Sequence, residues 1–270
     1  MFKKISPYNF LVTYISKIKK RQRFIIATFC LSFLMLFSTF LSFNQLKYYI
    51  LILGVLTYFF TFFSILERIQ KIEWATLFIH PIYFTIVFDL FFFLLPVRWL
   101  TRIPFISIYA ISIYAILLSS NIFNVRVVKS LQLNRSAFSI NYLFLTLTSF
   151  LVVNLILSFK LNFLFNLILI SIFLFPLALQ FFWVANPQNN LDRGLIKYAF
   201  LVSLYIGEIA LIFSFIPLRQ IIFSLLLTAC FYSLLGLFYA YIEGRLFVNR
   251  VKEFLLVLII IFIITALSIG

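Results

Sequence analysis

Residues 161–185 read LNFLFNLILISIFLFPLALQFFWVA and contain no Asp, Glu, Lys or Arg. An α-helix needs about 20 apolar residues to cross the roughly 30 Å of hydrocarbon in a bilayer. This stretch is therefore long enough to span a membrane as one helix. On both sides of it, stretches of similar character follow one another with short connections. The predicted spans are 24–43, 48–66, 75–95, 103–122, 137–159, 161–185, 195–216, 221–241 and 254–269.

The composition agrees with this pattern over the whole length of the chain. Of the 270 residues, 64% are hydrophobic and only 11% are charged, a balance that a water-soluble domain of this size cannot bury. The sequence predicts an all-α, polytopic transmembrane helix bundle of about nine spans. The stretch 254–269 is the shortest, because its 16 residues extend only about 24 Å as a helix. The first apolar block has no small-x-small cleavage pattern after it, so we expect it to stay as a membrane anchor.

The distribution of basic residues predicts an orientation. Of the 22 Lys and Arg residues, 17 fall in the N-terminal segment and in every second connection after it, and 5 fall in the other connections. Segments rich in Lys and Arg are retained on the cytoplasmic side. We therefore expect the N-terminus inside and, with nine spans, the C-terminus outside.

Two regions follow from this reading. Residues 1–23 are a basic cytoplasmic segment in which Ile5, Tyr8, Val12 and Ile15 recur near helical spacing. They predict an amphipathic helix on the membrane surface; the alternative is an ordinary basic flank before the first span. Residues 24–270 form the transmembrane domain.

The net charge of +15 is compatible with two kinds of anionic partner, nucleic acid and anionic lipid. The basic residues are dispersed among short connections and form no single face, which argues against nucleic acid and favours anionic lipid. Arg98 and Arg102 flank Trp99 at the predicted outer ends of the third and fourth spans. Within 123–136, a connection that reads either as an interfacial helix or as a basic loop, the candidate lipid contacts are Arg126, Lys129 and Arg135.

Three ionisable side chains fall within predicted spans: Asp89, Glu208 and His80. An ionisable group in hydrocarbon is costly and marks a partner or a function. Asp89 and Glu208 are expected at similar depths near the outer ends of their spans, so that they could face one another. Such a pair has two interpretations, a structural hydrogen-bonded pair or a proton or transport site. His80 lies nine residues before Asp89, about half a turn out of phase.

The sequence contains none of the enzyme or metal-binding motifs that we considered. The chain has no His-Glu-x-x-His motif, no Gly-x-Ser-x-Gly elbow and no Gly-rich phosphate loop. Its single His excludes a multi-His metal site, and Cys30 and Cys230 both fall in spans. We predict no catalytic residue, metal or cofactor. Only 6 Gly residues are present, which argues against the close helix packing and broken helices of many transporters.

Local turn and helix-end patterns give two further expectations. Residues 67–73 continue the second span into water, with Glu67, Lys71 and Glu73 as exposed charges. In the polar connection 186–194, Asn190 or Asp192 caps the helix that follows.

The stretch 73–125, particularly 73–78 (EWATLF) and 119–125 (SSNIFNV), resembles segments of uncharacterised multi-pass membrane proteins of small-genome bacteria. The resemblance extends over about a fifth of the chain. It implies a protein of the bacterial inner membrane and brings no activity with it.

The sequence thus favours an integral membrane protein with an accessory or structural role, acting through lipid or a membrane-protein partner. The first alternative is a small-solute or lipid transporter that uses the intramembrane carboxyls. The second is a lipid-linked transferase, which needs an acidic or His cluster at one membrane face that this chain lacks.

Overall fold

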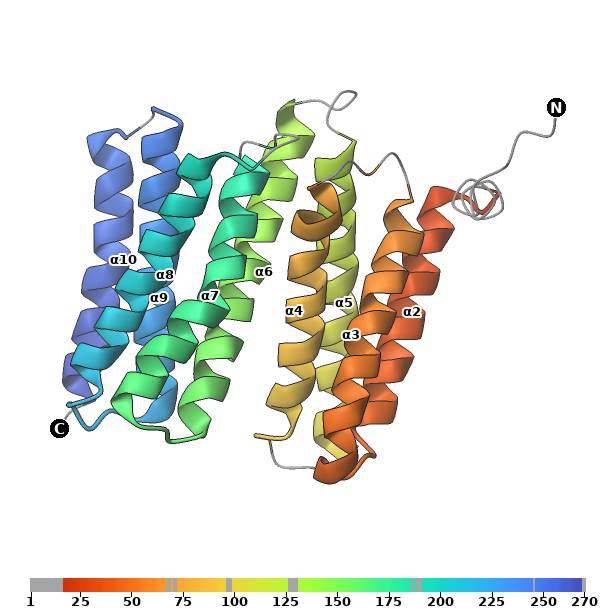
Figure 1. Cartoon of the computed structure of the whole chain (residues 1–270), viewed down its shortest axis with the longest axis horizontal. Helices are drawn as coiled ribbons and strands as arrows, with labels where there is room; N and C mark the ends of the chain where they lie inside the picture. Colours follow the sequence, from red (N-terminus) through yellow and green to blue (C-terminus); the bar gives the residue numbers. More distant parts are fainter. Residues whose placement is uncertain are drawn as a thin grey trace. The chain divides into compact units, whose positions relative to one another are not determined.

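The computed structural model describes residues 17–66, 69, 72–95, 99–125, 131–185, 187, 191–244 and 246–268. Within these residues all regular structure is helical (Figure 1). The helices are α2 (Lys20–Ser38), α3 (Phe43–Ile65), α4 (Glu73–Phe92), α5 (Trp99–Asn124), α6 (Leu131–Ser158), α7 (Phe163–Ala185), α8 (Arg193–Phe213), α9 (Gln220–Ile242) and α10 (Val248–Leu267).

Each predicted span has one of these helices, and the all-helical fold class is confirmed for the described residues. The boundaries differ by a few residues, most at α6 and α10, which begin at Leu131 and Val248, each six residues before the predicted start. Asp192 is the N-cap of α8, where its Oδ1 accepts a hydrogen bond from the Gly194 N–H at 3.2 Å. The predicted amphipathic segment falls largely on residues 1–16, which lie outside the described residues.

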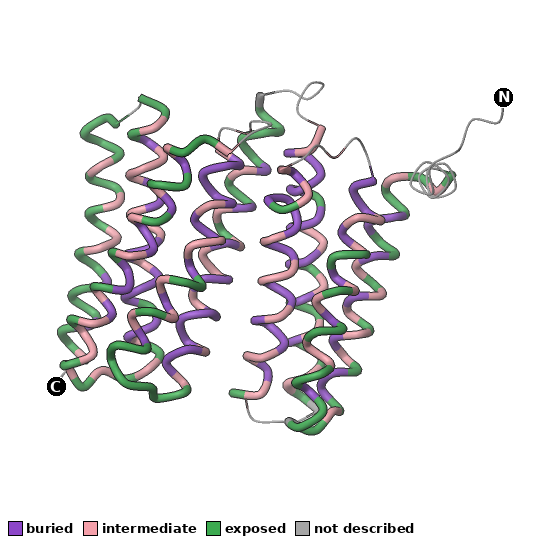
Figure 2. Tube along the Cα trace, viewed as in Figure 1, coloured by how far each residue is buried: buried purple, intermediate pink, exposed green. Residues whose placement is uncertain are grey.

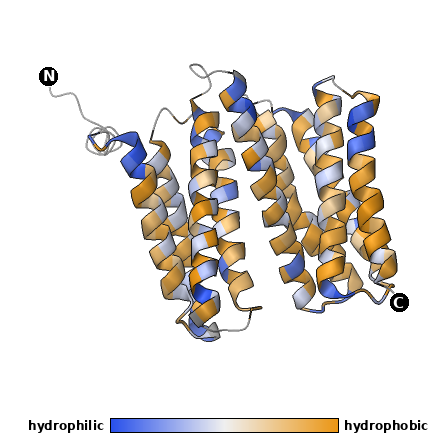
Figure 3. Cartoon of the chain, turned by 180° about the vertical axis from the view of Figure 1, so that it is seen from behind, coloured by the Kyte–Doolittle hydropathy of each residue, from blue (hydrophilic) through white to orange (hydrophobic). Residues whose placement is uncertain are grey.

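Eight helices, α2 to α9, are long and apolar enough to cross a membrane. Large apolar side chains are exposed on them, for example Phe29 on α2 and Leu51 on α3. Figure 2 shows that exposed residues recur along the lengths of the helices. Hydrophobic residues dominate the helix bodies, and many of the hydrophilic residues lie towards the helix ends (Figure 3). These are the features of a multi-pass membrane protein.

Helix α10 differs from the other eight because it begins with charges. Arg250, Lys252 and Glu253 lie in its first two turns, and the Arg250 Nη1 and Glu253 Oε2 atoms are 3.5 Å apart. From residue 254 to the helix end at Leu267 the rise is only about 20 Å, less than the hydrocarbon thickness of about 30 Å. The ninth crossing and the inside-outside orientation stay predictions.

The chain divides into two compact units, Met1–Asn141 and Tyr142–Gly270, with the division inside α6. In the first unit, α2 packs on α3 and α5, and α4 packs on the same two helices. An aromatic ladder joins α4 to α5: Phe84 and Phe88 pack against Tyr109, and Phe88 and Phe92 pack against Phe105, at centroid distances of 4.2–5.9 Å. Since the α4 residues recur every four positions, they form one stripe of the helix.

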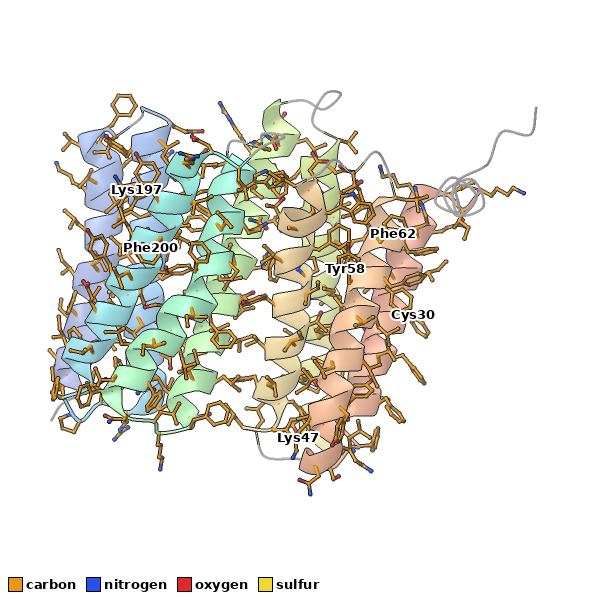
Figure 4. All side chains as sticks on the ribbon, in the orientation of Figure 1. Cys30, Lys47, Tyr58, Phe62, Lys197 and Phe200 are labelled. Carbon is orange, nitrogen blue, oxygen red and sulfur yellow. The ribbon has the colours of Figure 1, made fainter. Side chains whose placement is uncertain are left out.

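A second aromatic cluster joins α3 to α4 near the start of α4. Tyr58 and Phe62, labelled in Figure 4, contact Trp74, and the Tyr58 and Phe78 ring centroids are 4.5 Å apart. The Trp74 and Phe78 rings stack at 5.8 Å. Aromatic pairs of this geometry each add about 0.5–1.5 kcal/mol beyond their buried area. The two clusters hold α4 between its neighbours and so position the polar side chains that it carries.

In the second unit, α7 packs on α8 and α9, and α9 packs on α8 and α10. Gly207 of α8 allows the close approach of α7: a Cβ there would lie 2.9 Å from the Leu167 carbonyl oxygen and would overlap Ser171 Oγ. At Gly236 of α9, an added Cβ would overlap the Phe254 ring of α10. The expectation from the low Gly count therefore needs correction, because two of the few glycines lie at close helix contacts.

Candidate functional site

Buried ionisable side chains gather in the first unit. Among the described residues, Arg23, Glu73, His80 and Asp89 are buried, whereas the buried polar side chains of the second unit are hydroxyls and amides. Glu73 is the first residue of α4 and only 5% exposed, so the expectation that it lies in water is wrong. Glu67 and Lys71 lie outside the described residues. The first unit is accordingly where intramembrane chemistry has to be sought.

Asp89 lies one turn before the end of α4 and is fully buried. Its Oδ1 is hydrogen-bonded to Ser38 Oγ, at the last residue of α2. Its Oδ2 has no hydrogen-bond partner among the described residues. The side chain therefore joins α4 to α2 through one oxygen and leaves the other oxygen without a donor.

Two further hydroxyls lie beside this contact. Thr85, one turn before Asp89 on α4, has its Oγ1 2.9 Å from the Tyr109 hydroxyl of α5. Tyr109 is fully buried and packs against Phe88, the residue before Asp89 on α4. Ser38, Thr85, Asp89 and Tyr109, here called the Asp89 cluster, bring polar groups of α2, α4 and α5 together.

His80 belongs to a different contact. Its Nδ1 is 2.9 Å from Asn141 Oδ1 of α6, and both side chains are fully buried. His80 and Asp89 thus bond to different neighbours, α6 and α2, as expected from their half-turn offset along α4. His80 Nδ1 and Asn141 Oδ1 thus join α4 to α6, apart from the contact of Asp89 with α2.

Glu208 has the opposite environment. It lies on the exposed face of α8 in the second unit, five residues before the helix end at Phe213. Among the described residues it forms no hydrogen bond or ion pair. The structure describes the two units separately, so the pairing of Asp89 with Glu208 stays a prediction.

Of the five basic residues predicted to contact anionic lipid, the structure describes Arg102 and Arg135. Arg102 Nη2 donates to the Thr39 carbonyl at 3.2 Å, and its guanidinium lies 4.5 Å above the Phe40 ring, so it binds the end of α2. Arg135 is exposed near the start of α6. Arg98, Arg126 and Lys129 lie outside the described residues. The described ends of 123–136 belong to α5 and α6, with no separate interfacial helix in them.

The second unit has an amide network that links α6 to α9. Asn154 Nδ2 donates to Ser224 Oγ at 3.1 Å, and Gln220 Nε2 donates to the Asn154 carbonyl at 3.0 Å. These bonds tie two helices at one end of the unit. No group of three or more His, Cys, Asp or Glu side chains comes together among the described residues.

The chain belongs to a family described as "Protein of unknown function (DUF5656)", whose model matches residues 67–268, about three quarters of the sequence. No curated protein and no solved structure matches the chain. The match begins at residue 67, so it includes α4 to α10 and leaves α2 and α3 outside. Asp89, Thr85 and Tyr109 fall inside the matched region, and Ser38 falls outside it.

Sequence reasoning found Asp89 and His80 but missed their partners. Thr85 could have been found, because it precedes Asp89 by four residues and a helix places such residues on one face. Ser38 and Asn141 carry no such signal: they are 51 and 61 residues away from Asp89 and His80.

Proposed function

We propose that the protein is an accessory or structural component of the bacterial inner membrane, with its N-terminus in the cytoplasm, that works through a membrane-protein partner. One observation carries the proposal: Glu208 lies on an exposed face of a span-length apolar helix with no described partner. Ionisable residues in spans normally face the bundle interior or a paired group.

The depth of Glu208 favours a partner. Five residues separate it from the end of α8, which places it about 7.5 Å inside the helix. Phe200, Tyr205 and Ile212 are exposed on the same helix, and Lys197 and Phe200 of α8 are labelled in Figure 4. A charge costs about 2.5–3.5 kcal/mol at the centre of a spanning helix on insertion scales, and less towards the helix ends. A transmembrane helix that carries Lys or Arg at the matching depth would remove this cost.

The test is photo-cross-linking in native membranes of the source bacterium, with the photoreactive residue at Ile212, one turn from Glu208. The control position is Ile259 on α10, which is also exposed. We expect a protein adduct at Ile212 that is lost in Glu208→Leu and kept in Glu208→Asp. Glu243→Leu, which removes an exposed carboxyl after the end of α9, is the matched control and should keep the adduct.

A partner identified in this way is then tested by exchanging the charges of Glu208 and of the partner's basic residue. Glu208→Lys should abolish the adduct, and replacement of the partner's basic residue by Glu should restore it. Adducts with lipid alone, an adduct with a second copy of this chain, or an adduct unchanged in Glu208→Leu would each contradict the proposal.

A small-solute or lipid transporter that uses intramembrane carboxyls is the second candidate. The unpartnered Oδ2 of buried Asp89 favours it, because such an oxygen is available to a proton or a cation. Uptake into vesicles that contain the purified protein, abolished by Asp89→Asn, would support transport over the accessory role. The anionic-lipid contacts predicted at the basic residues are compatible with both functions.

A further inference from the structure

The carbonyl groups at the end of α2 need hydrogen-bond donors from outside the regular helix. The last four carbonyls of a helix have no intrahelical N–H partner. In α2, three of the four accept from backbone N–H groups beyond the helix: Leu36 from Thr39, Phe37 from Phe40, and Ser38 from Leu41. The fourth, the Met35 carbonyl, accepts from Ser38 Oγ at 2.6 Å.

Ser38 Oγ therefore has two oxygen neighbours that both need a donor, besides the weak acceptor Met35 Sδ at 4.0 Å. It bonds to the Met35 carbonyl and to Asp89 Oδ1, yet a serine hydroxyl carries a single hydrogen. If that hydrogen goes to a charged Asp89, the Met35 carbonyl loses its donor. If it goes to Met35, a hydrogen between Ser38 Oγ and Asp89 Oδ1 has to come from the carboxyl itself.

The tyrosine hydroxyls of the neighbouring helices α3 and α5 bond to other groups. Tyr49 of α3 donates its hydroxyl to the Leu34 carbonyl at 2.7 Å, and Tyr109 of α5 shares its hydrogen bond with Thr85 of α4. No Lys, Arg or His among the described residues forms an ion pair with Asp89. A charged carboxylate would thus lie fully buried with an oxygen that has no donor, whereas a neutral acid needs only one hydrogen-bond acceptor.

We propose that Asp89 binds a proton and donates it to Ser38 Oγ, which in turn donates to the Met35 carbonyl. Binding adds one proton to Oδ1 and changes no other covalent bond. The chain Asp89–Ser38–Met35 then satisfies every hydrogen-bonding atom except Oδ2, which becomes a neutral carbonyl oxygen. This proton site goes beyond the accessory role and does not depend on Glu208. It fastens α4, inside the family match, to α2, outside it.

Infrared difference spectroscopy on the full chain tests the site in lipid at neutral pH. We expect the carbonyl stretch of a protonated carboxylic acid, shifted in deuterated water and lost in Asp89→Asn. The matched carboxyl variant Glu208→Gln should leave this band in place. Ser38→Ala, which retains Asp89 but removes its acceptor, should move the band to higher wavenumber because the acid is then no longer hydrogen-bonded.

Three outcomes would overturn the proposal. The first is the loss of carboxylate bands, and not of an acid band, in Asp89→Asn. The second is an acid band that Ser38→Ala leaves unmoved. The third is an acid band that appears only when sodium is removed, since the site would then hold a metal cation and not a proton. The Ser38→Ala measurement decides the matter even where Asp89→Asn fails to fold.

Discussion

At the scale of single residues, some buried polar side chains of the first unit bond to a side chain on a neighbouring helix. Thr85 with Tyr109 and His80 with Asn141 are examples, each at 2.9 Å. Interhelical hydrogen bonds in membrane proteins average only about 0.6 kcal/mol and reach about 1.7. The pairs therefore add little to the stability of the bundle, and their main effect is to determine which helix faces are in contact.

The Thr85–Tyr109 pair allows a clean measurement of this effect. Thr85→Val and Tyr109→Phe each remove the hydroxyl and nearly preserve shape. We expect a double-mutant coupling energy of about 0.6 kcal/mol in reversible unfolding from mixed detergent. Strict additivity of the two substitutions would show that the hydroxyls do not bond. The same cycle between Thr85→Val and Thr148→Val, a buried hydroxyl of the second unit, should give no coupling.

Individual partners were the part of the candidate site that the sequence did not predict. Asp89 was found because a carboxyl inside an apolar stretch is visible without any structure. Its contact with Ser38 depends on the rotation of α2 and α4 about their axes, which pattern alone does not determine. Glu208 looked equivalent to Asp89 in sequence, and only the packing of α8 shows that it is exposed.

At the scale of helices, the predicted elements are present because hydrophobic length is a local property of the chain. All nine predicted spans coincide with helices in the described residues. Their packing is less local. The fit of α8 against α7 depends on Gly207, and nothing in the sequence distinguishes it from Gly54. At Gly54 an added Cβ would meet the Ile86 side chain, with Cδ1 at 3.3 Å.

This contrast gives a prediction for the two glycines. Gly207→Ala should lower the free energy of unfolding by about 1–3 kcal/mol, because the methyl group meets the Leu167 carbonyl oxygen, and backbone cannot move aside cheaply. Gly54→Ala should cost less or stabilise, since the Ile86 side chain can adjust and Ala is the better helix former. Thermal unfolding of the purified variants measures both. Equal stability of Gly207→Ala and the parent chain would contradict the close approach.

At the scale of the whole molecule, α10 decides the number of membrane crossings. The charge asymmetry predicts that a reporter fused after Gly270 lies outside the cytoplasm, with alkaline phosphatase active and a fluorescent protein dark. The opposite result would leave eight spans, in agreement with the short apolar length of α10. A fusion within 123–136 should report the cytoplasm in both cases and serves as the control.

The contact between Asp89 and Ser38 also bears on how the chain is made. Synthesis proceeds from the N-terminus, so α2 reaches the bilayer 51 residues before Asp89 does. When α4 inserts, Ser38 of α2 is already in the membrane. The Asp89 carboxyl therefore has a hydrogen-bond partner and is not surrounded by lipid alone. A polar group that would hinder the insertion of an isolated α4 is thus accommodated by the order of biosynthesis.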